Sequence, residues 1–285
     1  MTNRNTLSLL GAGAALARRA RLGRALAVMM DAADRVLLRT LTPPLATSVE
    51  GLELRGYLRH RGFLEYVAQG MAEETFYRSL LLRSVDSETT FVDGGAHIGV
   101  YTVLMCRRAR RVVVFEPDPY NVAALERNVR RAGCSNVEIH AAALANESGQ
   151  ATFRAFRSTF SGSLAAREVD DYREFATDVV SLDEVLDDAD LRALVVKLDV
   201  EGAEPLALVG MRETIRDAAR LVLFVEVNPE ALEAGGSSAQ RLLEDLLASG
   251  MECAFADEEA RALVPMRETA PLSKGNLVCR KRLGN

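Results

Sequence analysis

The sequence has no tryptophan, no paired cysteine motif and no excess of positive charge. Its formal net charge of −5 at neutral pH leaves the chain without the overall basic footprint of a nucleic-acid-binding protein. Its four cysteines lie far apart with no Cys-x-x-Cys pair, a spacing that gives neither a zinc signature nor a disulfide framework. We therefore expect buried free thiols in a reducing cytoplasm, no metal, and no nucleic-acid partner.

Long hydrophobic runs are also absent, because no run reaches the roughly 18 apolar residues of a membrane-spanning helix. The first 30 residues contain five arginines and no acid, and Leu7–Ala17 forms a short apolar run. This segment fits an accessory helix. It also fits a basic helix that contacts a membrane surface or a partner through residues 1–40, or a targeting segment.

What the chain does contain is an apolar, β-branched run that ends in an acid and three glycines. Phe91 and Val92 precede Asp93, Gly94 and Gly95, and Gly99 follows before a stretch with helical spacing. The pattern predicts a buried strand, a tight turn and a helix start. It differs from the G-x-G-x-x-G turn that holds a diphosphate. A carboxylate there suits a cation or an amino-acid head group, as in S-adenosylmethionine.

A second acid follows the next apolar run. Val112–Phe115 ends in Glu116, which lies 23 residues after Asp93. An acid about 20 residues past the glycine turn typically binds the ribose hydroxyls of a nucleotide cofactor. Its two oxygens can accept hydrogen bonds from two neighbouring hydroxyls. The pair of signals predicts an adenosyl-binding sheet edge.

Downstream of Phe91, strand and helix patterns alternate, which predicts βαβ units and a parallel sheet. Met251–Ala256 and Asn276–Arg280 are expected to finish the sheet as an antiparallel hairpin. Residues 157–178 show no periodicity and predict either a substrate-facing loop or a disordered one.

Upstream of Phe91, two helices and a hairpin are expected. The periodicity of Leu22–Leu41 predicts a helix that Pro43 and Pro44 stop. Residues 45–62 read as a short hairpin, and Glu65–Ser84 as one helix over the cofactor crevice. We therefore divide the chain into an N-terminal helical extension, residues 1–62, and a cofactor-binding domain, residues 63–285.

The runs DGGAHIG, FEPDP and KLDVEGAE, at residues 93–99, 115–119 and 197–204, together resemble the motif set of a known family. It is the FkbM-type family of S-adenosylmethionine-dependent methyltransferases, and the resemblance covers roughly Glu73 to the C-terminus. It implies a class I methyltransferase fold, an α/β Rossmann-like, doubly wound, mostly parallel seven-stranded sheet with an antiparallel last strand. It also implies an enzyme of class EC 2.1.1, usually an O-methyltransferase of a sugar or secondary metabolite. His97 stands where the family commonly has Asn.

Site residues follow from these motifs and from the chemistry of methyl transfer. We expect Asp93 near the methionine ammonium group and Glu116 on the ribose hydroxyls. The expected cofactor-binding residues are Asp93, Gly94, Gly95, Ala96, Gly99, Glu116, Pro117, Asp118 and Ala142. Asp199, Glu201 and His97 are the candidate catalytic residues, because a hydroxyl acceptor must lose a proton. Asp199, Glu201 and Glu226 could alternatively hold Mg²⁺.

Two further readings of the same sheet stay open at this point. An NAD(P)-dependent oxidoreductase shares the topology, although the glycine spacing and Asp93 weigh against it. A non-catalytic cofactor-binding module that docks through its basic N-terminus is the other, although such a pocket need not keep its strand-end acids. The leading reading is a cytoplasmic O-methyltransferase with S-adenosyl-L-methionine as cofactor.

Overall fold

The computed structural model describes residues 45–57, 60–156, 162–163, 172–267 and 272–281. The chain divides into two compact units, residues 1–44 and 45–285, and every described residue belongs to the second. The predicted helix at Leu22–Leu41 and the arginine-rich segment therefore lie outside the described residues. The domain boundary after residue 62 and the contact through residues 1–40 stay predictions. Within the described ranges, no helix has the length and apolarity needed to cross a membrane.

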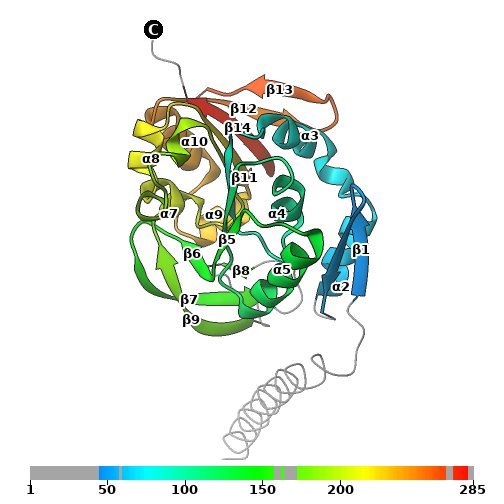
Figure 1. Ribbon diagram of the computed structural model, residues 1–285. Coiled ribbons are helices and arrows are strands. Elements are labelled where there is room, and N and C mark those ends of the chain that lie inside the picture. Colours follow the sequence, from blue (N-terminus) through cyan, green and yellow to red (C-terminus); the bar gives the residue numbers. More distant parts are fainter. Residues whose placement is uncertain (1–44, 58–59, 157–161, 164–171, 268–271, 282–285) are drawn as a thin grey trace, which may run out of the picture. The chain divides into compact units, whose positions relative to one another are not determined.

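One eight-stranded sheet, in the order β13-β12-β14-β11-β10-β3-β4-β5, forms the centre of the described unit (Figure 1). Five neighbouring strands run parallel: β11 (Leu221–Val227), β10 (Leu194–Leu198), β3 (Thr90–Gly94), β4 (Arg111–Phe115) and β5 (Val137–His140). The antiparallel pairing expected of the last two strands is confirmed, because β14 (Gly275–Lys281) pairs antiparallel with both β11 and β12 (Met251–Asp257). β13 (Ala262–Pro265) adds one edge strand to the expected seven.

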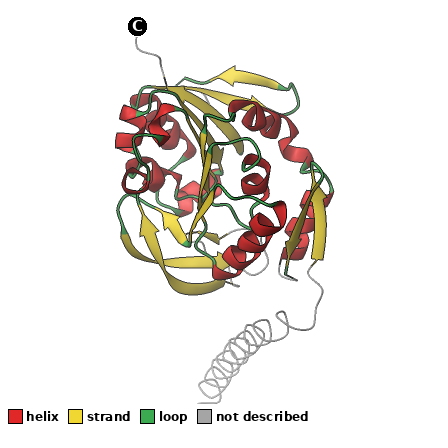
Figure 2. Ribbon diagram, in the orientation of Figure 1, coloured by secondary structure: helices red, strands yellow, loops and turns green. Residues whose placement is uncertain are grey.

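Both faces of this sheet are covered by helices, which explains why its central strands are nearly continuous apolar runs (Figure 2). Consecutive strand residues point to opposite faces, so Phe91 packs in one hydrophobic cluster and Val92 in the other. The first cluster includes residues of α3 (Thr75–Ser84), α4 (Val100–Met105) and α5 (Pro119–Ala132). The second includes residues of α7 (Glu204–Val209), α8 (Arg212–Asp217) and α10 (Ala239–Ala248). The unit also contains two further short helices, α6 (Leu182–Val185) and α9 (Pro229–Ala234).

A second, four-stranded sheet includes part of the segment that the sequence predicted as a loop. Its order is β6-β9-β7-β8, formed by β6 (Ala142–Leu144), β7 (Gly149–Phe156), β8 (Gly162–Ser163) and β9 (Tyr172–Val180). The loop prediction is therefore wrong for residues 162–163 and 172–178. Burial alternates along β9, but inward-facing positions such as Arg173 and Thr177 are polar, so hydrophobicity alone concealed the strand.

The N-terminal part of the described unit is a hairpin followed by a broken helix. The predicted hairpin is confirmed by β1 (Leu45–Val49) and β2 (Leu52–Gly56). The single helix expected over Glu65–Ser84 is wrong, because α2 (Arg61–Ala68) and η2 (Ala72–Glu74) precede α3. Gly70 and Met71 adopt left-handed backbone angles, φ +79° and +49°, which stop α2 and turn the chain.

All four cysteines are paired, so the prediction of free thiols is wrong. Cys106, at the end of α4, is bonded to Cys134, just past α5. Cys253 and Cys279 occupy directly opposed positions on β12 and β14 and are bonded to each other. The partners are separated by 28 and 26 residues along the chain, and only the folded topology brings them together.

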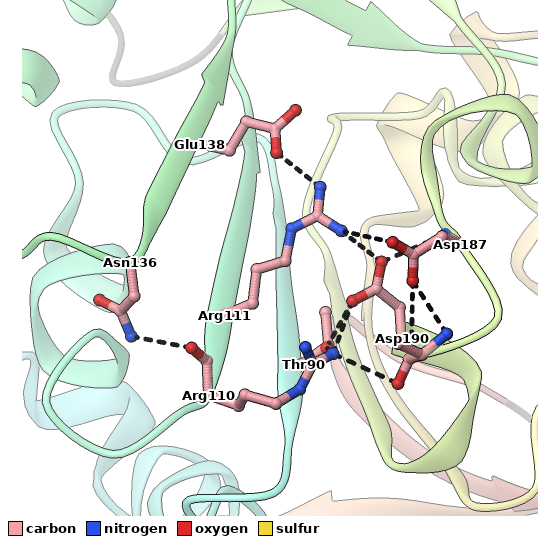
Figure 3. Close-up of polar contacts among 8 residues, drawn as sticks. Thr90, Arg110, Arg111, Asn136, Glu138, Asp187 and Asp190 are labelled. Carbon is pink, nitrogen blue, oxygen red and sulfur yellow. Dashed lines mark hydrogen bonds and ion pairs between the residues drawn. The ribbon is translucent and has the colours of Figure 1, made fainter.

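A charged network fixes the amino-terminal ends of the central strands (Figure 3). Asp190, just before β10, is fully buried and accepts hydrogen bonds from Thr90, Arg110 and Arg111. Arg111 also pairs with Glu138 of β5. A buried carboxylate needs such partners, because losing them would leave an uncompensated charge. The network therefore ties three strands, β3, β4 and β5, to the 3-10 turn η3 (Asp190–Arg192) before β10. It lies at the opposite end of the strands from the acids predicted to bind the cofactor.

Candidate active site

A cavity of about 270 Å³ opens at the carboxyl ends of β3, β4, β10 and β11. In an open α/β sheet, ligands bind beyond the carboxyl ends of the strands, at the point where the strand order reverses. The sheet contributes the turn after β3, Glu116, Asp199 and Glu226, while α2 and η2 contribute another part of the wall. Nearly all acids that the sequence placed at strand ends therefore converge on one cavity.

The turn after β3 depends on its glycines because other parts of the protein approach it closely. Gly95 has φ +80°, and a Cβ there would lie 1.9 Å from the carbonyl oxygen of Asp199. Gly99 has φ +88°, and its Cβ would lie 2.4 Å from Leu125. Gly95, Ala96 and His97 line the cavity, whereas Gly94 and Gly99 serve packing behind it.

Asp93 lies behind the cavity wall and is fully buried. It accepts a hydrogen bond of 2.6 Å from Thr102 Oγ1, and its other oxygen lies 4.0 Å from Lys197 Nζ. Burial raises the pKa of Asp93, while Lys197 and Thr102 oppose that shift. The carboxylate therefore faces a buried lysine, and its predicted contact with the methionine ammonium stays a prediction.

Glu116 is the buried carboxylate at the end of β4, and it lines the cavity. It accepts hydrogen bonds from the backbone N–H groups of His97 (2.8 Å) and Asp118 (2.9 Å), and from Asn121 Nδ2 (3.2 Å). Burial raises its pKa to about 8. Pro117 also lines the cavity. These donors hold the carboxylate in one orientation, as a ribose ligand requires.

Two further predicted cofactor ligands lie outside the cavity lining, as Asp93, Gly94 and Gly99 do. Asp118 caps α5 by accepting a hydrogen bond from the Tyr120 N–H, and it pairs with Arg173 at 2.9 Å. Ala142 is buried in β6. The sequence analysis missed the next two residues, Ala143 and Leu144, and also Phe153 of β7; all three line the cavity.

Three carboxylates gather where β10 and β11 end. Asp199, Glu201 and Glu226 each offer an oxygen, and these atoms lie within 4.8 Å of one another. Lys197 Nζ donates to Asp199 Oδ2 at 2.9 Å and is itself buried. Burial, together with Asp199 and Glu201, raises the pKa of Glu226 to about 10. Chemically, this group can accept a proton from an acceptor hydroxyl or ligate a divalent cation.

Glu204, the last acid of the KLDVEGAE run, is structural. Its carboxylate accepts the N–H groups of Val200 and Gly202, each at 2.9 Å, and is buried. Burial raises its pKa to about 7. It therefore shapes the loop that presents Asp199 and Glu201. Glu204 is also the first residue of α7, where the helix dipole stabilises a negative charge.

A cover formed by α2 and η2 was only partly anticipated. Phe63 and Tyr66 of α2 and Glu74 of η2 line the cavity, and Tyr101 donates a 2.6 Å hydrogen bond to Glu74. The ring of His97 packs edge-on against Phe63, with centroids 4.3 Å apart. The expectation that this segment covers the crevice thus holds for α2, although the sequence did not indicate which side chains would reach inward.

S-adenosyl-L-methionine fits this set of groups. Glu116 presents carboxylate oxygens to hydroxyl donors, and the excess of acids over bases in the cavity lining favours a cationic sulfonium. A diphosphate would meet these acids and only two lysines, Lys197 and Lys274. The doubly wound sheet with its reversed last strand and this site define a class I methyltransferase.

The family is shown by sequence comparison. A family model described as "Methyltransferase FkbM domain" matches residues 93–255, more than half of the chain, so the chain belongs to that family. The protein is a methyltransferase and its cofactor is S-adenosyl-L-methionine, as the resemblance implied. This membership replaces the oxidoreductase reading. A search of curated proteins found no match to the sequence.

The solved structures that match this chain share little sequence with it. An rRNA methylase from Streptococcus thermophilus is 12% identical, with 74% of this chain and 97% of that chain covered and a TM-score of 0.45. SMU.1697c, a putative methyltransferase from Streptococcus mutans in complex with SAH, is 10% identical, with 74% and 98% covered and a TM-score of 0.43. These likenesses do not bear on the methyl acceptor.

Proposed function

We propose that the protein is an O-methyltransferase that methylates a hydroxyl of a sugar, glycan or secondary metabolite. The observation that supports this proposal is the group of Asp199, Glu201 and Glu226 in the cavity, with oxygens within 4.8 Å of one another. A neutral hydroxyl becomes a competent acceptor only as its proton leaves, so a nearby carboxylate is the feature that such chemistry requires.

The bound cofactor supplies an electrophilic methyl group on a sulfonium. In this proposal Glu116 binds the ribose hydroxyls, and the backbone of Gly95 and Ala96 lies beside the cofactor. Lys197 donates to Asp199 Oδ2 and holds this carboxylate in one orientation. The Asp199 carboxylate then takes the proton of the acceptor hydroxyl, and much of the rate comes from holding the acceptor in line.

Glu201 and His97 take different parts in this arrangement. Glu201 has a left-handed backbone, φ +54°, which turns its side chain at the edge of the cavity, within reach of Asn228. It is the second candidate proton acceptor. His97 lines the cavity beneath α2, and its predicted catalytic role stays a prediction. The three acids can alternatively hold a divalent cation that lowers the pKa of the hydroxyl.

The test combines an acceptor screen with two matched variants. The full chain is incubated with labelled methyl donor and a panel of sugars, glycans and hydroxylated metabolites, with and without Mg²⁺. With an acceptor identified, we expect Asp199→Asn to lower kcat by roughly 10²- to 10⁴-fold while S-adenosylhomocysteine affinity changes little. Asp188→Asn, an exposed acid in the loop before β10, is the control. Labelling on nitrogen or carbon, or full kcat in Asp199→Asn, would contradict the proposal.

A further inference from the structure

We propose that His60 is a positioning residue for the cofactor, and that it couples the α2 cover to Glu116 through Asn121. None of these contacts touches the reacting atoms. The inference rests on the cofactor being S-adenosyl-L-methionine and on Glu116 being its ribose ligand. It goes beyond the proposed acceptor chemistry, because it concerns how the N-terminal segment and the cofactor stabilise each other.

Hydrogen bonds lead from Tyr57 through His60 and Asn121 to Glu116, and we call this series of contacts the relay. The backbone N–H of Tyr57 donates to His60 Nδ1 at 3.0 Å, which leaves the ring proton on Nε2. His60 Nε2 therefore donates to Asn121 Oδ1, also at 3.0 Å. Asn121 in turn donates through Nδ2 to Glu116 Oε1 at 3.2 Å. The Nε2 donor of His60 sets the orientation of the Asn121 amide, so a change in His60 is transmitted to the carboxylate.

In its ionised form, Glu116 meets hydrogen-bond donors on both carboxylate oxygens. Oε1 accepts hydrogen bonds from Asn121 Nδ2 and the Asp118 N–H, and Oε2 accepts one from the His97 N–H. All three are donors, and a carboxylate surrounded by donors keeps its remaining lone pairs for further donors, such as ribose hydroxyls. His60 is 2% exposed, so water does not compete for its contacts.

The segment that carries His60 is attached to α5 at a second point. Asn128 lies seven residues after Asn121, on the same face of the helix. Its amide pairs with the backbone of Arg55 through Oδ1 (2.8 Å) and Nδ2 (3.0 Å), and Nδ2 also donates to the carbonyl of Ile98 (2.8 Å). Two asparagines of one helix thus hold the hairpin and the start of α2.

Gly56 makes room for the histidine. A Cβ at position 56 would lie 2.9 Å from His60 Nδ1 and 2.9 Å from His60 Cβ, closer than real contacts allow. The β2 strand and the His60 ring are therefore fitted to each other. The same segment then supplies Phe63, whose ring contacts His97, and Tyr66, so the cover of the cavity depends on the position of His60.

Coupling of this kind is reciprocal. If His60 orients Glu116 for the cofactor, bound cofactor must equally stabilise the docked segment. Removing the contact between His60 and Asn121 should therefore weaken cofactor binding. It should also reduce the protection against amide hydrogen exchange that the cofactor gives to the segment. A purely structural histidine would affect stability without this link.

Two amide variants separate the contact of His60 with Tyr57 from its contact with Asn121. In His60→Gln the amide nitrogen reaches the place of Nε2 and keeps the contact with Asn121, whereas in His60→Asn the amide oxygen replaces Nδ1 and keeps only the contact with Tyr57. Calorimetric titration of the full chain with S-adenosylhomocysteine is expected to give wild-type affinity within about threefold for His60→Gln. We expect a loss of about tenfold for His60→Asn, the worth of one hydrogen bond between neutral groups. The KM for S-adenosylmethionine should rise by a similar factor.

Hydrogen exchange and a double variant complete the test. S-adenosylhomocysteine should slow amide exchange in residues 60–68 of the wild type, and less so in His60→Asn. His60→Asn combined with Glu116→Gln should lose no more affinity than Glu116→Gln alone. Equal affinities of the two His60 variants, or additive losses in the double variant, would overturn the coupling. Failure of the wild type to bind would instead overturn the cofactor assignment, and normal binding by Glu116→Gln would overturn the ribose role.

Discussion

At the scale of single residues, the protein places several carboxylates where burial works against their charge. Glu116 is the clearest case because its neighbours are known on both oxygens. Its ordinary pKa is 4.5, and burial raises it to about 8 in the folded chain. Between these values the folded protein holds a proton that the unfolded chain has released.

This predicts how stability depends on pH in the absence of cofactor. A raised carboxyl pKa stabilises the folded state fully below pH 4.5, and that contribution is lost as the pH rises through about 8. We expect the free energy of unfolding to fall by about 1 kcal/mol per pH unit between pH 5 and pH 8 for this group. Glu116→Gln should flatten the dependence, measured by urea unfolding at each pH.

The slope of the variant should be reduced and not abolished. Glu204 and Glu226 have raised pKa values of about 7 and about 10, so they change stability in the same direction. A Glu116→Gln profile that parallels the wild type at every pH would show that the carboxylate is already ionised when the protein folds.

At the scale of elements, the close contact between the turn after β3 and the loop after β10 shapes the cofactor end of the sheet. We expect Gly95→Ala to lower the free energy of unfolding by several kcal/mol, about 3 or more, because a Cβ would meet the Asp199 carbonyl at 1.9 Å and Ala disfavours φ +80°. The loop that carries Asp199 must move, so S-adenosylhomocysteine binding should also weaken. Denaturant unfolding and calorimetry measure the two effects.

A matched glycine isolates the steric part of this effect. Gly133, after α5, has a similar φ of +70°, but a Cβ there would meet nothing within 4 Å. Gly133→Ala should therefore cost only about 1 kcal/mol, the price of the left-handed backbone, and leave cofactor affinity unchanged. Equal destabilisation by the two variants would mean that β3 and β10 do not approach closely.

At the scale of the whole described unit, two disulfides close loops of similar length, with separations of 28 and 26 residues. In the chain-entropy account a loop of this size contributes about 3 kcal/mol. We expect reduction by a phosphine to lower the Tm, and the Cys106→Ser/Cys134→Ser variant to reproduce part of that loss. Non-reducing mass spectrometry should find the chain lighter by four hydrogens. Alkylation of four thiols in the folded, unreduced protein would contradict both bridges.

The local motifs predicted much of this architecture because they depend on neighbouring residues. The turn at Gly95, the strand ending before Glu116 and the antiparallel pairing of the last two predicted strands are all present. Gly70 inside the pattern of Glu65–Ser84 was the local sign of the break in that helix, but apolar residues continued across it with helical spacing.

The sequence by itself determined the motifs at the strand ends, and with them the methyltransferase family and its cofactor. Only the tertiary structure decided that Asp93 faces Lys197 behind the cavity, that Asp118 caps a helix, and that His60 reaches Asn121, 61 residues away. It alone paired the cysteines and built the second sheet. Such contacts join residues far apart in the chain, and no local propensity or spacing encodes which distant side chain will occupy the space beside a given group.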